Sequence, residues 1–300
     1  MSEQIKKFLT REGVEYRECF DISRISAVRI GGTAEIAAYP RCEEELISLV
    51  RFLRDRGEGY RVVGGASNIL FGDGNIKTVI IFTGRISSIR ISDKTVFAEC
   101  GARLGEICKL AREASLGGLE ELSGIPGSVG GAVAGNSGAF GAELSDYMEY
   151  VRAYDPRDDT IREIPASECG FSYRSSRFSC GEELVLSLRL RLKSRGREEI
   201  SERSEHFRRL RMEKQPYDMP SLGCTFKKTG DFSAGELIDR CGLKGFSLGG
   251  ALVSSRHAGF IVNKGGATAA DYIALAYLCR KSVFERFHLN IEPEIKFLMH

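Results

Sequence analysis

The segment spanning residues 117–141 constrains this sequence more than any other. It holds nine glycines in 25 residues, and small residues fill most of the other positions. A segment so poor in side chains does not build a long helix or a packed strand, but it lets backbone N–H groups approach a ligand closely. Successive amides in turns form a concave site that suits a phosphate group. The segment therefore predicts an anion site lined by the backbone.

A second glycine-rich segment lies nearer the N-terminus. Residues 64–68 (Gly-Gly-Ala-Ser-Asn) directly follow a short run with strand character, Tyr60–Val63. Neither segment is a Walker A loop or has the G-x-G-x-x-G spacing of a Rossmann domain. One Gly-Gly pair usually serves a turn, whereas two such segments favour a site for a phosphorylated cofactor. The residues alone do not name that cofactor.

The charge balance narrows the range of partners. Lys and Arg number 43 and Asp and Glu 41, so the formal net charge is +2. A surface for nucleic acid or for an anionic membrane needs a larger cationic excess, and we expect neither partner. No stretch approaches the roughly 20 apolar residues of a membrane span, and the N-terminus carries no apolar signal segment. We expect a cytoplasmic protein.

The nine cysteines and four histidines are dispersed along the chain. No Cys-x-x-Cys occurs, and the spacing predicts no metal site. Scattered thiols in odd number are typical of a reducing compartment. With the exception of Cys224, which is considered below, we expect them to be buried and inert.

Hydrophobic periodicity predicts an α+β chain. The expected helices are residues 42–56, 104–114, 197–214, 234–241 and 268–287. The expected strands are residues 60–63, 77–82, 95–100, 151–154, 160–164, 184–193, 251–255, 259–263 and 291–298. Alternation after Tyr150 favours an antiparallel sheet. The charged helix at 197–214 is stopped by Pro216 and Pro220, and we place a domain boundary near residues 195–215.

Several ordered blocks of the sequence resemble one enzyme family, the UDP-N-acetylenolpyruvoylglucosamine reductases, which are flavoenzymes of bacterial cell-wall synthesis. The blocks are residues 29–32, 64–68, 124–132, 136–141, 173–178, 214–216, 220–227, 235–263 and 292–294. They span about residues 20–298, and so many blocks in the same order make a chance match improbable.

The resemblance implies a domain order and a reaction. Residues 1–195 would form an FAD-binding domain of the vanillyl-alcohol-oxidase type, in two subdomains split near residue 85, and residues 196–300 an α+β substrate-binding domain. FAD would be bound non-covalently, with NADPH as hydride donor. The implied reaction reduces UDP-N-acetylglucosamine enolpyruvate to UDP-N-acetylmuramate in peptidoglycan precursor synthesis. The 50 positions from Arg174 to Cys224 resemble the shorter subtype of the family.

By the same resemblance, the cofactor-binding residues lie in the two glycine-rich segments. They are Gly64, Gly65, Ala66, Ser67, Asn68, Gly124, Ile125, Pro126, Gly127, Ser128, Gly130, Gly131, Asn136, Gly138 and Ala139. These blocks contain no His or Cys that would form a covalent flavin link.

Three residues match the catalytic positions of the family. Arg174 suits neutralisation of the substrate carboxylate, because a guanidinium binds a carboxylate through two parallel hydrogen bonds. Glu294 suits hydrogen bonding to the developing oxygens, and Cys224 suits proton donation to carbon, where the family has Ser or Cys. Glu292 shares the strand face of Glu294, and pattern alone does not choose between them; the match to the family's Glu-Pro-Glu favours Glu294.

Substrate binding is implied for Tyr173, Lys214 and Lys227, although Lys214 equally suits the solvated end of a charged helix. The sequence departs from the family's usual residues at a few positions, which are Ala134, Gly135, Phe140, Lys228 and Leu252.

Two other functions are open from the residues. One is an FAD-dependent oxidase or dehydrogenase of the same cofactor fold with another substrate. The other is an inert nucleotide-sugar-binding protein, against which the presence of Arg174, Cys224 and Glu294 together argues.

Overall fold

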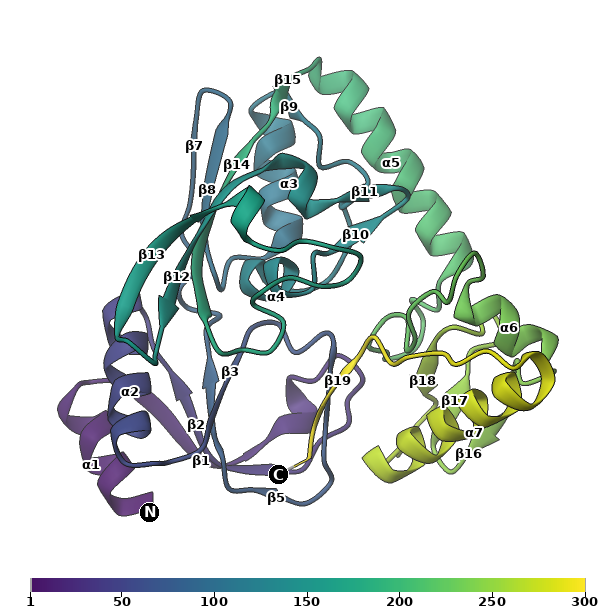
Figure 1. The fold of residues 1–300 in the computed structure, drawn as a ribbon, viewed down its shortest axis with the longest axis horizontal. Coiled ribbons are helices and arrows are strands. Elements are labelled where there is room, and N and C mark those ends of the chain that lie inside the picture. Colours follow the sequence, from purple (N-terminus) through teal and green to yellow (C-terminus); the bar gives the residue numbers. More distant parts are fainter. Residues whose placement is uncertain (1, 300) are drawn as a thin grey trace. The chain divides into compact units, whose positions relative to one another are not determined.

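The computed structural model describes residues 2–299, and its backbone forms two compact units (Figure 1). Unit 1 comprises residues 2–18, Glu35–Gly65 and Thr78–Arg209. Unit 2 comprises Cys19–Ala34, Ala66–Lys77 and residues 210–299. The chain passes from unit 1 to unit 2 for the last time between Arg209 and Leu210, which lie within residues 195–215. The sequence did not indicate that two N-terminal segments also belong to unit 2.

A small sheet lies mainly in unit 1, with β5 in unit 2, and its strands β2, β3, β5 and β6 run parallel. Its strand order is β1-β2-β6-β3, with β5 beside β2. The strands are β1 (Glu15–Asp21), β2 (Thr33–Tyr39), β3 (Tyr60–Val63), β5 (Asn75–Ile76) and β6 (Val79–Phe82). Helices α1 (Ser2–Arg11) and α2 (Glu43–Asp55) contribute to its core with apolar side chains such as Leu9, Leu49 and Leu53. Gly57, with a φ of +66°, follows the end of α2 as predicted.

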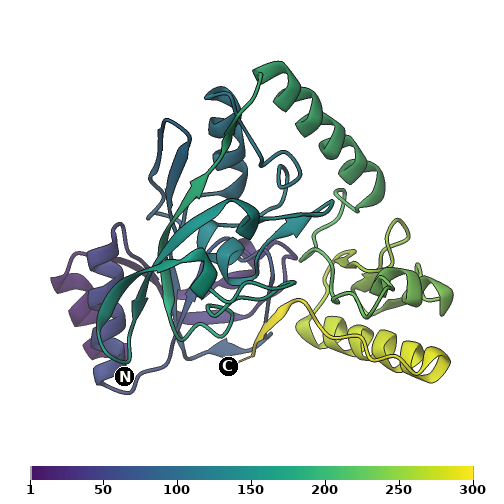
Figure 2. The same ribbon diagram turned by 45° about the horizontal axis from the view of Figure 1, so that its top comes forward.

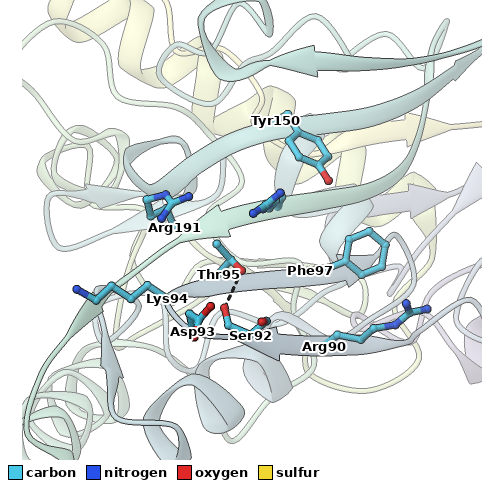
Figure 3. Close-up of a pocket in the computed structure, with 9 residues that line it drawn as sticks. Arg90, Ser92, Asp93, Lys94, Thr95, Phe97, Tyr150 and Arg191 are labelled. Atoms are coloured by element: carbon cyan, nitrogen blue, oxygen red, sulfur yellow. Dashed lines mark hydrogen bonds between the residues drawn. The ribbon is translucent and has the colours of Figure 1, made fainter.

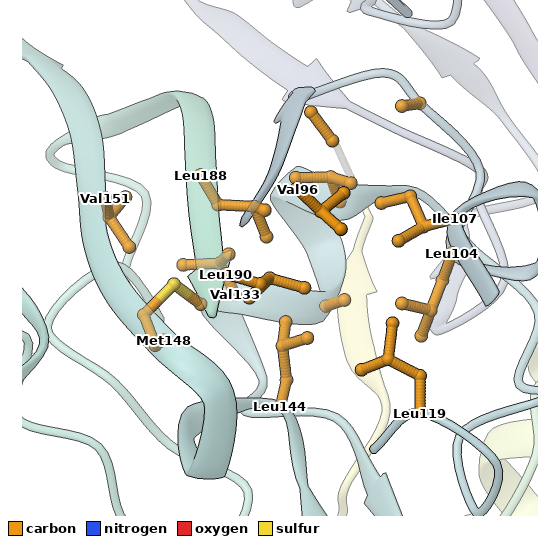
Figure 4. Packing of buried hydrophobic residues seen from close by; sticks show 14 of the residues in the cluster. Val96, Leu104, Ile107, Leu119, Val133, Leu144, Met148, Val151, Leu188 and Leu190 are labelled. Carbon is orange, nitrogen blue, oxygen red and sulfur yellow. The ribbon is translucent and has the colours of Figure 1, made fainter. Parts of the chain in front are cut away.

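A five-stranded antiparallel sheet forms the larger part of unit 1, as the alternation of apolar residues after Tyr150 predicted. Its order is β13-β12-β14-β8-β7. The strands are β7 (Ile89–Ser92), β8 (Thr95–Glu99), β12 (Met148–Asp155), β13 (Thr160–Pro165) and β14 (Leu184–Arg191). Helices α3 (Leu104–Glu113) and α4 (Val129–Ala134) pack on one face of it (Figure 2). Figure 4 shows the resulting core, in which Val133 of α4 lies among Val96, Leu188 and Leu190.

Short strand pairs complete unit 1. They are β9 (Leu116–Gly117) with β15 (Lys193–Ser194), and β10 (Gly138–Ala139) with β11 (Ala142–Glu143). Helix α5 (Arg197–Lys214) has the bounds predicted from its charged, proline-free sequence.

Unit 2 is built on a three-stranded antiparallel sheet and two helices. The sheet holds β16 (Ser247–Leu248), β17 (Ala251–Val253) and β18 (Ile261–Asn263), and the helices are α6 (Ala234–Arg240) and α7 (Ala269–Phe287). Thr268 and Asp271 form a capping box at the start of α7. The last strand, β19 (Lys296–Leu298), pairs in parallel with β4 (Ile69–Phe71).

The prediction that the cysteines other than Cys224 are buried is correct for Cys100, Cys169 and Cys279. It is wrong for Cys19 and Cys180, which are exposed, while Cys42, Cys108 and Cys241 are half-buried. Burial raises the pKa of the Cys100 and Cys279 thiols to about 12 and that of Cys169 to about 11, so these three are inert at neutral pH. Composition alone does not separate the two groups, because exposure depends on which face of an element a residue occupies.

Within residues 2–299 no helix is both long and apolar enough to cross a membrane.

Candidate functional site

The two glycine-rich segments meet in unit 1. A Cβ atom added to Gly64 would lie 1.8 Å from the Ser128 Oγ, and one added to Gly65 would lie 3.0 Å from the Gly127 Cα. Any side chain at Gly64 or Gly65 would therefore force the two segments apart. We call these four residues the glycine cradle.

The glycine cradle contains a buried polar atom that suits a ligand. Ser128 is only 4% exposed, and its Oγ has no hydrogen-bond partner within the described chain. Ser128 precedes α4, yet its side chain makes no capping hydrogen bond. A buried hydroxyl without a partner costs free energy unless a ligand satisfies it. A cradle without side chains and with one buried hydroxyl fits the predicted FAD.

Backbone hydrogen bonds hold the longer segment in place. The Val129 amide donates to the Ala102 carbonyl and the Gly130 amide to the Cys100 carbonyl, both at 2.8 Å. The Gly127 carbonyl accepts from the Leu104 amide at 3.1 Å. The amides of Val129 and Gly130 therefore anchor the segment, so Gly130 would have to contact FAD through its other atoms.

Asn136 serves the fold of the same segment. It is fully buried with a φ of +39°. Its Nδ2 donates to the Glu143 carboxylate at 2.6 Å and to the Ser172 carbonyl at 3.2 Å, and its Oδ1 accepts from the Ser145 amide. The Asn136 side chain is thus occupied by protein partners, and a contact with FAD would have to come from its backbone.

Arg174 is presented by a tight turn. Ser172 and Ser175 exchange two backbone hydrogen bonds of 3.0 Å, and Arg174 between them has a φ of +54°. Its guanidinium donates to the Gly138 carbonyl at 2.5 Å and lies 5.1 Å from the centre of the Tyr173 ring. The structure therefore brings the predicted charge-neutralising arginine to a backbone group of the predicted flavin segment.

The chain passes into unit 2 between Gly65 and Ala66, so the rest of the first glycine-rich segment lies there. Ala66 is buried with a φ of +47°. The Asn68 Nδ2 donates to the Glu294 carbonyl at 3.2 Å, and the Lys296 amide donates to the Asn68 carbonyl at 2.9 Å. Asn68, predicted to bind the cofactor, is therefore fixed to Glu294, predicted to act in catalysis.

Cys224 and Glu294 lie on paired backbone segments of unit 2. The Glu294 amide donates to the Thr225 carbonyl at 2.8 Å, and the Lys227 amide donates to the Glu292 carbonyl at 2.9 Å. We call these paired segments, residues 224–227 and 292–294, the acid ladder. Cys224 and Glu294 are both half-buried; Cys224 directly precedes Thr225, and Glu294 pairs with Thr225. The sequence did not single out Thr225, since a buried threonine has no signal of its own.

The remaining predicted residues are more exposed. The Lys227 Nζ lies 3.8 Å from a Glu292 carboxylate oxygen, and the Glu292 side chain is 75% exposed. Lys214 ends α5 and is exposed, and Tyr173 is 43% exposed. The structure separates Glu292 from Glu294 by exposure, which the sequence pattern did not.

Known proteins match both parts of this chain. A family model described as "FAD binding domain" matches residues 34–164, and one described as "UDP-N-acetylenolpyruvoylglucosamine reductase, C-terminal domain" matches residues 215–298. The reductase of Caldicellulosiruptor bescii is 38% identical over 98% of this chain and 94% of its own length. That of Syntrophomonas wolfei is 38% identical over 99% of this chain and 98% of its own. This chain belongs to the UDP-N-acetylenolpyruvoylglucosamine reductase family.

The solved structures agree with that membership. The reductase of Thermus caldophilus matches 95% of this chain and 98% of its own, with 34% identity and a TM-score of 0.80. A glucose oxidase variant matches 65% of this chain with 14% identity and a TM-score of 0.50, which shows a shared fold alone. These matches confirm the predicted α+β fold with an FAD-binding domain, and the predicted FAD cofactor.

Proposed function

We propose that this protein reduces the enolpyruvyl group of UDP-N-acetylglucosamine enolpyruvate to a lactyl ether, with NADPH as the reductant, in peptidoglycan precursor synthesis. The observation that carries the proposal is family membership along nearly the whole chain, including both the FAD-binding and the reductase-specific C-terminal models. The C-terminal match supports this substrate over that of an oxidase with the same cofactor fold.

When bound, FAD would supply the hydride chemistry that links NADPH to the substrate. The glycine cradle would hold FAD, with the Ser128 hydroxyl as a hydrogen-bonding group and Gly64, Gly65 and Gly127 leaving room for the cofactor. The other assigned cofactor residues belong to the same two segments.

The side chains of the site would manage charge and protons. Hydride addition to the β-carbon leaves negative charge on the α-carbon and its carboxylate. Arg174 would neutralise the carboxylate, Glu294 in its protonated form would donate a hydrogen bond to the developing oxygens, and Cys224 would give its thiol proton to the α-carbon. The acid ladder supports these two roles, because it holds Cys224 and Glu294 on neighbouring backbone segments. Tyr173, Lys214 and Lys227 would bind the UDP phosphates or the substrate carboxylate.

We also propose the division of roles along the chain. Residues 1–195 would bind FAD, in two subdomains split near residue 85, and residues 196–300 would bind the substrate. The ranges of the two family models, 34–164 and 215–298, support this order. Because the proposed reaction uses NADPH and a UDP-sugar, we place the activity in the cytoplasm.

The test is the absorption spectrum of the purified protein under anaerobic conditions. The protein should be yellow, release FAD on acid precipitation, and bleach with NADPH. The enolpyruvyl substrate should restore the oxidised spectrum, whereas UDP-N-acetylglucosamine, which lacks the double bond, should not. A protein that stays bleached with the enolpyruvyl substrate would refute the proposal.

A further inference from the structure

The antiparallel sheet of unit 1 carries a hollow on the face opposite its core. The core side chains Val151, Leu188 and Ala98 occupy neighbouring strands, and the residues that alternate with them point to the other face. That face holds a cavity of about 490 Å³ (Figure 3). Helix α4 of the second glycine-rich segment packs on the core face, so the cavity is separate from the glycine cradle.

One cross-strand row builds the floor of this hollow. Tyr150 pairs with Arg189, Arg189 with Phe97, and Phe97 with Arg90, so aromatic and guanidinium groups alternate across four strands. The Arg189 guanidinium lies 5.9 Å from the centre of the Tyr150 ring and that of Arg90 lies 5.6 Å from the centre of the Phe97 ring. Stacking on a ring fixes the plane of a guanidinium, which leaves its N–H groups oriented for an anion.

The hollow has an excess of positive charge. Four cationic side chains line it, those of Arg90, Lys94, Arg189 and Arg191, together with one carboxylate, that of Asp93. Figure 3 labels all of these except Arg189. Glu149 pairs with Arg189 at 2.9 Å and also with Arg191. Within the described chain neither Arg90 nor Lys94 forms an ion pair with a carboxylate.

We propose that this basic hollow binds a pyrophosphate-bearing anion at a second site, separate from the cofactor and substrate. Planar guanidinium groups bind phosphate oxygens through paired hydrogen bonds, and the multiple negative charge of a diphosphate matches the local excess of positive charge. Because the guanidinium groups already cover the two aromatic rings, the phosphate is recognised and not a nucleobase. The molecule that carries this diphosphate group is either free pyrophosphate or a nucleotide.

The test is calorimetric titration of the FAD-loaded protein with pyrophosphate and, separately, with ADP. Arg90→Gln combined with Arg189→Gln should weaken pyrophosphate binding at least about tenfold. Glu149→Gln should strengthen it, because a competing carboxylate is removed. Arg51→Gln is the matched control, since Arg51 is also an exposed arginine of unit 1 paired with one carboxylate, that of Asp159; it should change nothing.

Tighter binding of pyrophosphate than of ADP would identify free pyrophosphate as the anion, and equal affinities the diphosphate of a nucleotide. Tighter binding of ADP would mean that the base is recognised and would overturn the proposal. Reductase activity of each variant reports that it is folded. Pyrophosphate binding that responds to neither the arginine changes nor Glu149→Gln would overturn the proposal.

A second inference concerns the acid ladder and rests on the proposed function. Thr225 is fully buried, directly follows Cys224 and is the residue that pairs with Glu294. Its amide donates to the Gly259 carbonyl at 2.8 Å, and its carbonyl accepts from the Glu294 amide at 2.8 Å. Its Oγ1 accepts from the Ile261 amide at 3.3 Å and lies 2.9 Å from the hydroxyl of Tyr272, which is also fully buried.

We infer that Thr225 and Tyr272 are positioning residues that set where Cys224 delivers its proton relative to Glu294. The four hydrogen bonds fix Thr225 on both sides and so hold the backbone from which the side chains of Cys224 and Glu294 project. Small misplacements of a reacting group cost large factors in rate. Thr225→Val keeps the shape and removes the hydroxyl, and Tyr272→Phe removes only the phenol oxygen.

Both variants should slow reoxidation of reduced enzyme by substrate about tenfold. Its solvent isotope effect should rise, because proton delivery then limits the rate, while reduction by NADPH is unchanged. Thr225→Ser should recover most of the rate. Variants that reoxidise at the parent rate with an unchanged isotope effect would overturn the inference. A parent enzyme that the substrate does not reoxidise would instead refute the proposed function.

Discussion

The glycine cradle and the acid ladder each join two segments that are distant in sequence, but by different means. In the cradle, backbones approach closely because Gly64, Gly65 and Gly127 lack side chains. In the ladder, backbone hydrogen bonds join the segments and leave side chains free to differ in exposure. A substitution in the cradle should therefore abolish FAD binding. A substitution in the ladder should instead lower the rate of substrate reduction and leave FAD bound.

The largest expected effect comes from Gly64→Ala in the cradle. The new Cβ would lie 1.8 Å from the Ser128 Oγ and 2.9 Å from the Ser128 Cβ, so the segments would separate. We expect the purified variant to contain no FAD, measured as flavin absorbance per protein. Gly105→Ala is the matched control, since no heavy atom lies within 4 Å of the new Cβ there. Combining Gly64→Ala with Ser128→Gly should restore part of the binding. A Gly64→Ala protein with a full complement of FAD would contradict the cradle.

Cys224→Ala should have the next largest effect. Removal of the thiol should slow substrate reduction by roughly 10²–10⁴, the usual contribution of a positioned general acid to the rate. Flavin content and the reduction of the flavin by NADPH should not change. Stopped-flow measurement of the two half-reactions separates these effects. Cys224→Ser should recover much of the loss, and Cys241→Ala, which removes another half-buried thiol of unit 2, should be neutral. Substrate reduction at the parent rate in Cys224→Ala would mean that the thiol only packs.

Arg174→Lys tests a residue that touches the cradle's segment but is proposed to act on substrate. A lysine cannot reproduce the two parallel hydrogen bonds, so substrate reduction should fall by roughly 10² while NADPH reduction changes little. Arg177→Lys is the control within the same motif, because Arg177 makes its paired bonds to Glu183 at 2.7 and 2.9 Å. An equal fall in both half-reactions would show that Arg174 matters for holding the Gly138 carbonyl.

The sequence predicted elements whose signals are local. Helix α5 has the predicted bounds, and α2 differs by one residue at each end, because periodicity and a terminal glycine are both visible in the sequence. Strand β2 was missed because it is buried and rich in small residues, such as Ala37 and Ala38, so it has no clear alternation. Helix α4 was missed because its glycines disfavour helix, and it forms through burial of Val129 and Val133.

The candidate site, too, could be predicted only where its signals are local. The two glycine-rich segments predicted a backbone-lined site by their composition, but not that Gly64 would meet Ser128. Pairing of distant segments depends on tertiary contacts, and a single sequence carries no record of them. For the same reason, Thr225 and the exposure difference between Glu292 and Glu294 were beyond prediction.

The ion pair between Asp155 and Arg157 lies outside both the glycine cradle and the acid ladder, so its loss should change stability and neither half-reaction. The hydrogen bonds from Arg157 lower the pKa of Asp155 to about 2, so the pair stabilises the fold when Asp155 is ionised. Arg157→Gln should slightly reduce the free energy of unfolding at neutral pH, because the Arg157 side chain is 62% exposed and water screens the pair. Because the folded pKa is depressed, this difference should be complete above the ordinary carboxyl pKa and disappear as pH falls toward 2. Urea unfolding across this range measures it, and a difference that persists at the lowest pH would contradict the assignment.

The smallest expected effect separates the two glutamates of the acid ladder. The Glu292 side chain is 75% exposed and its ion pair with Lys227 spans 3.8 Å, an arrangement that contributes little in water. Glu292→Ala should therefore change either half-reaction by less than about twofold. Glu294→Ala, its matched partner, should slow substrate reduction by roughly 10², on the scale of one lost transition-state donor. Since both variants keep the backbone hydrogen bonds of the ladder, a difference between them reports side-chain chemistry and not folding. If Glu292→Ala were the slower of the two, the roles of the two glutamates would have to be exchanged.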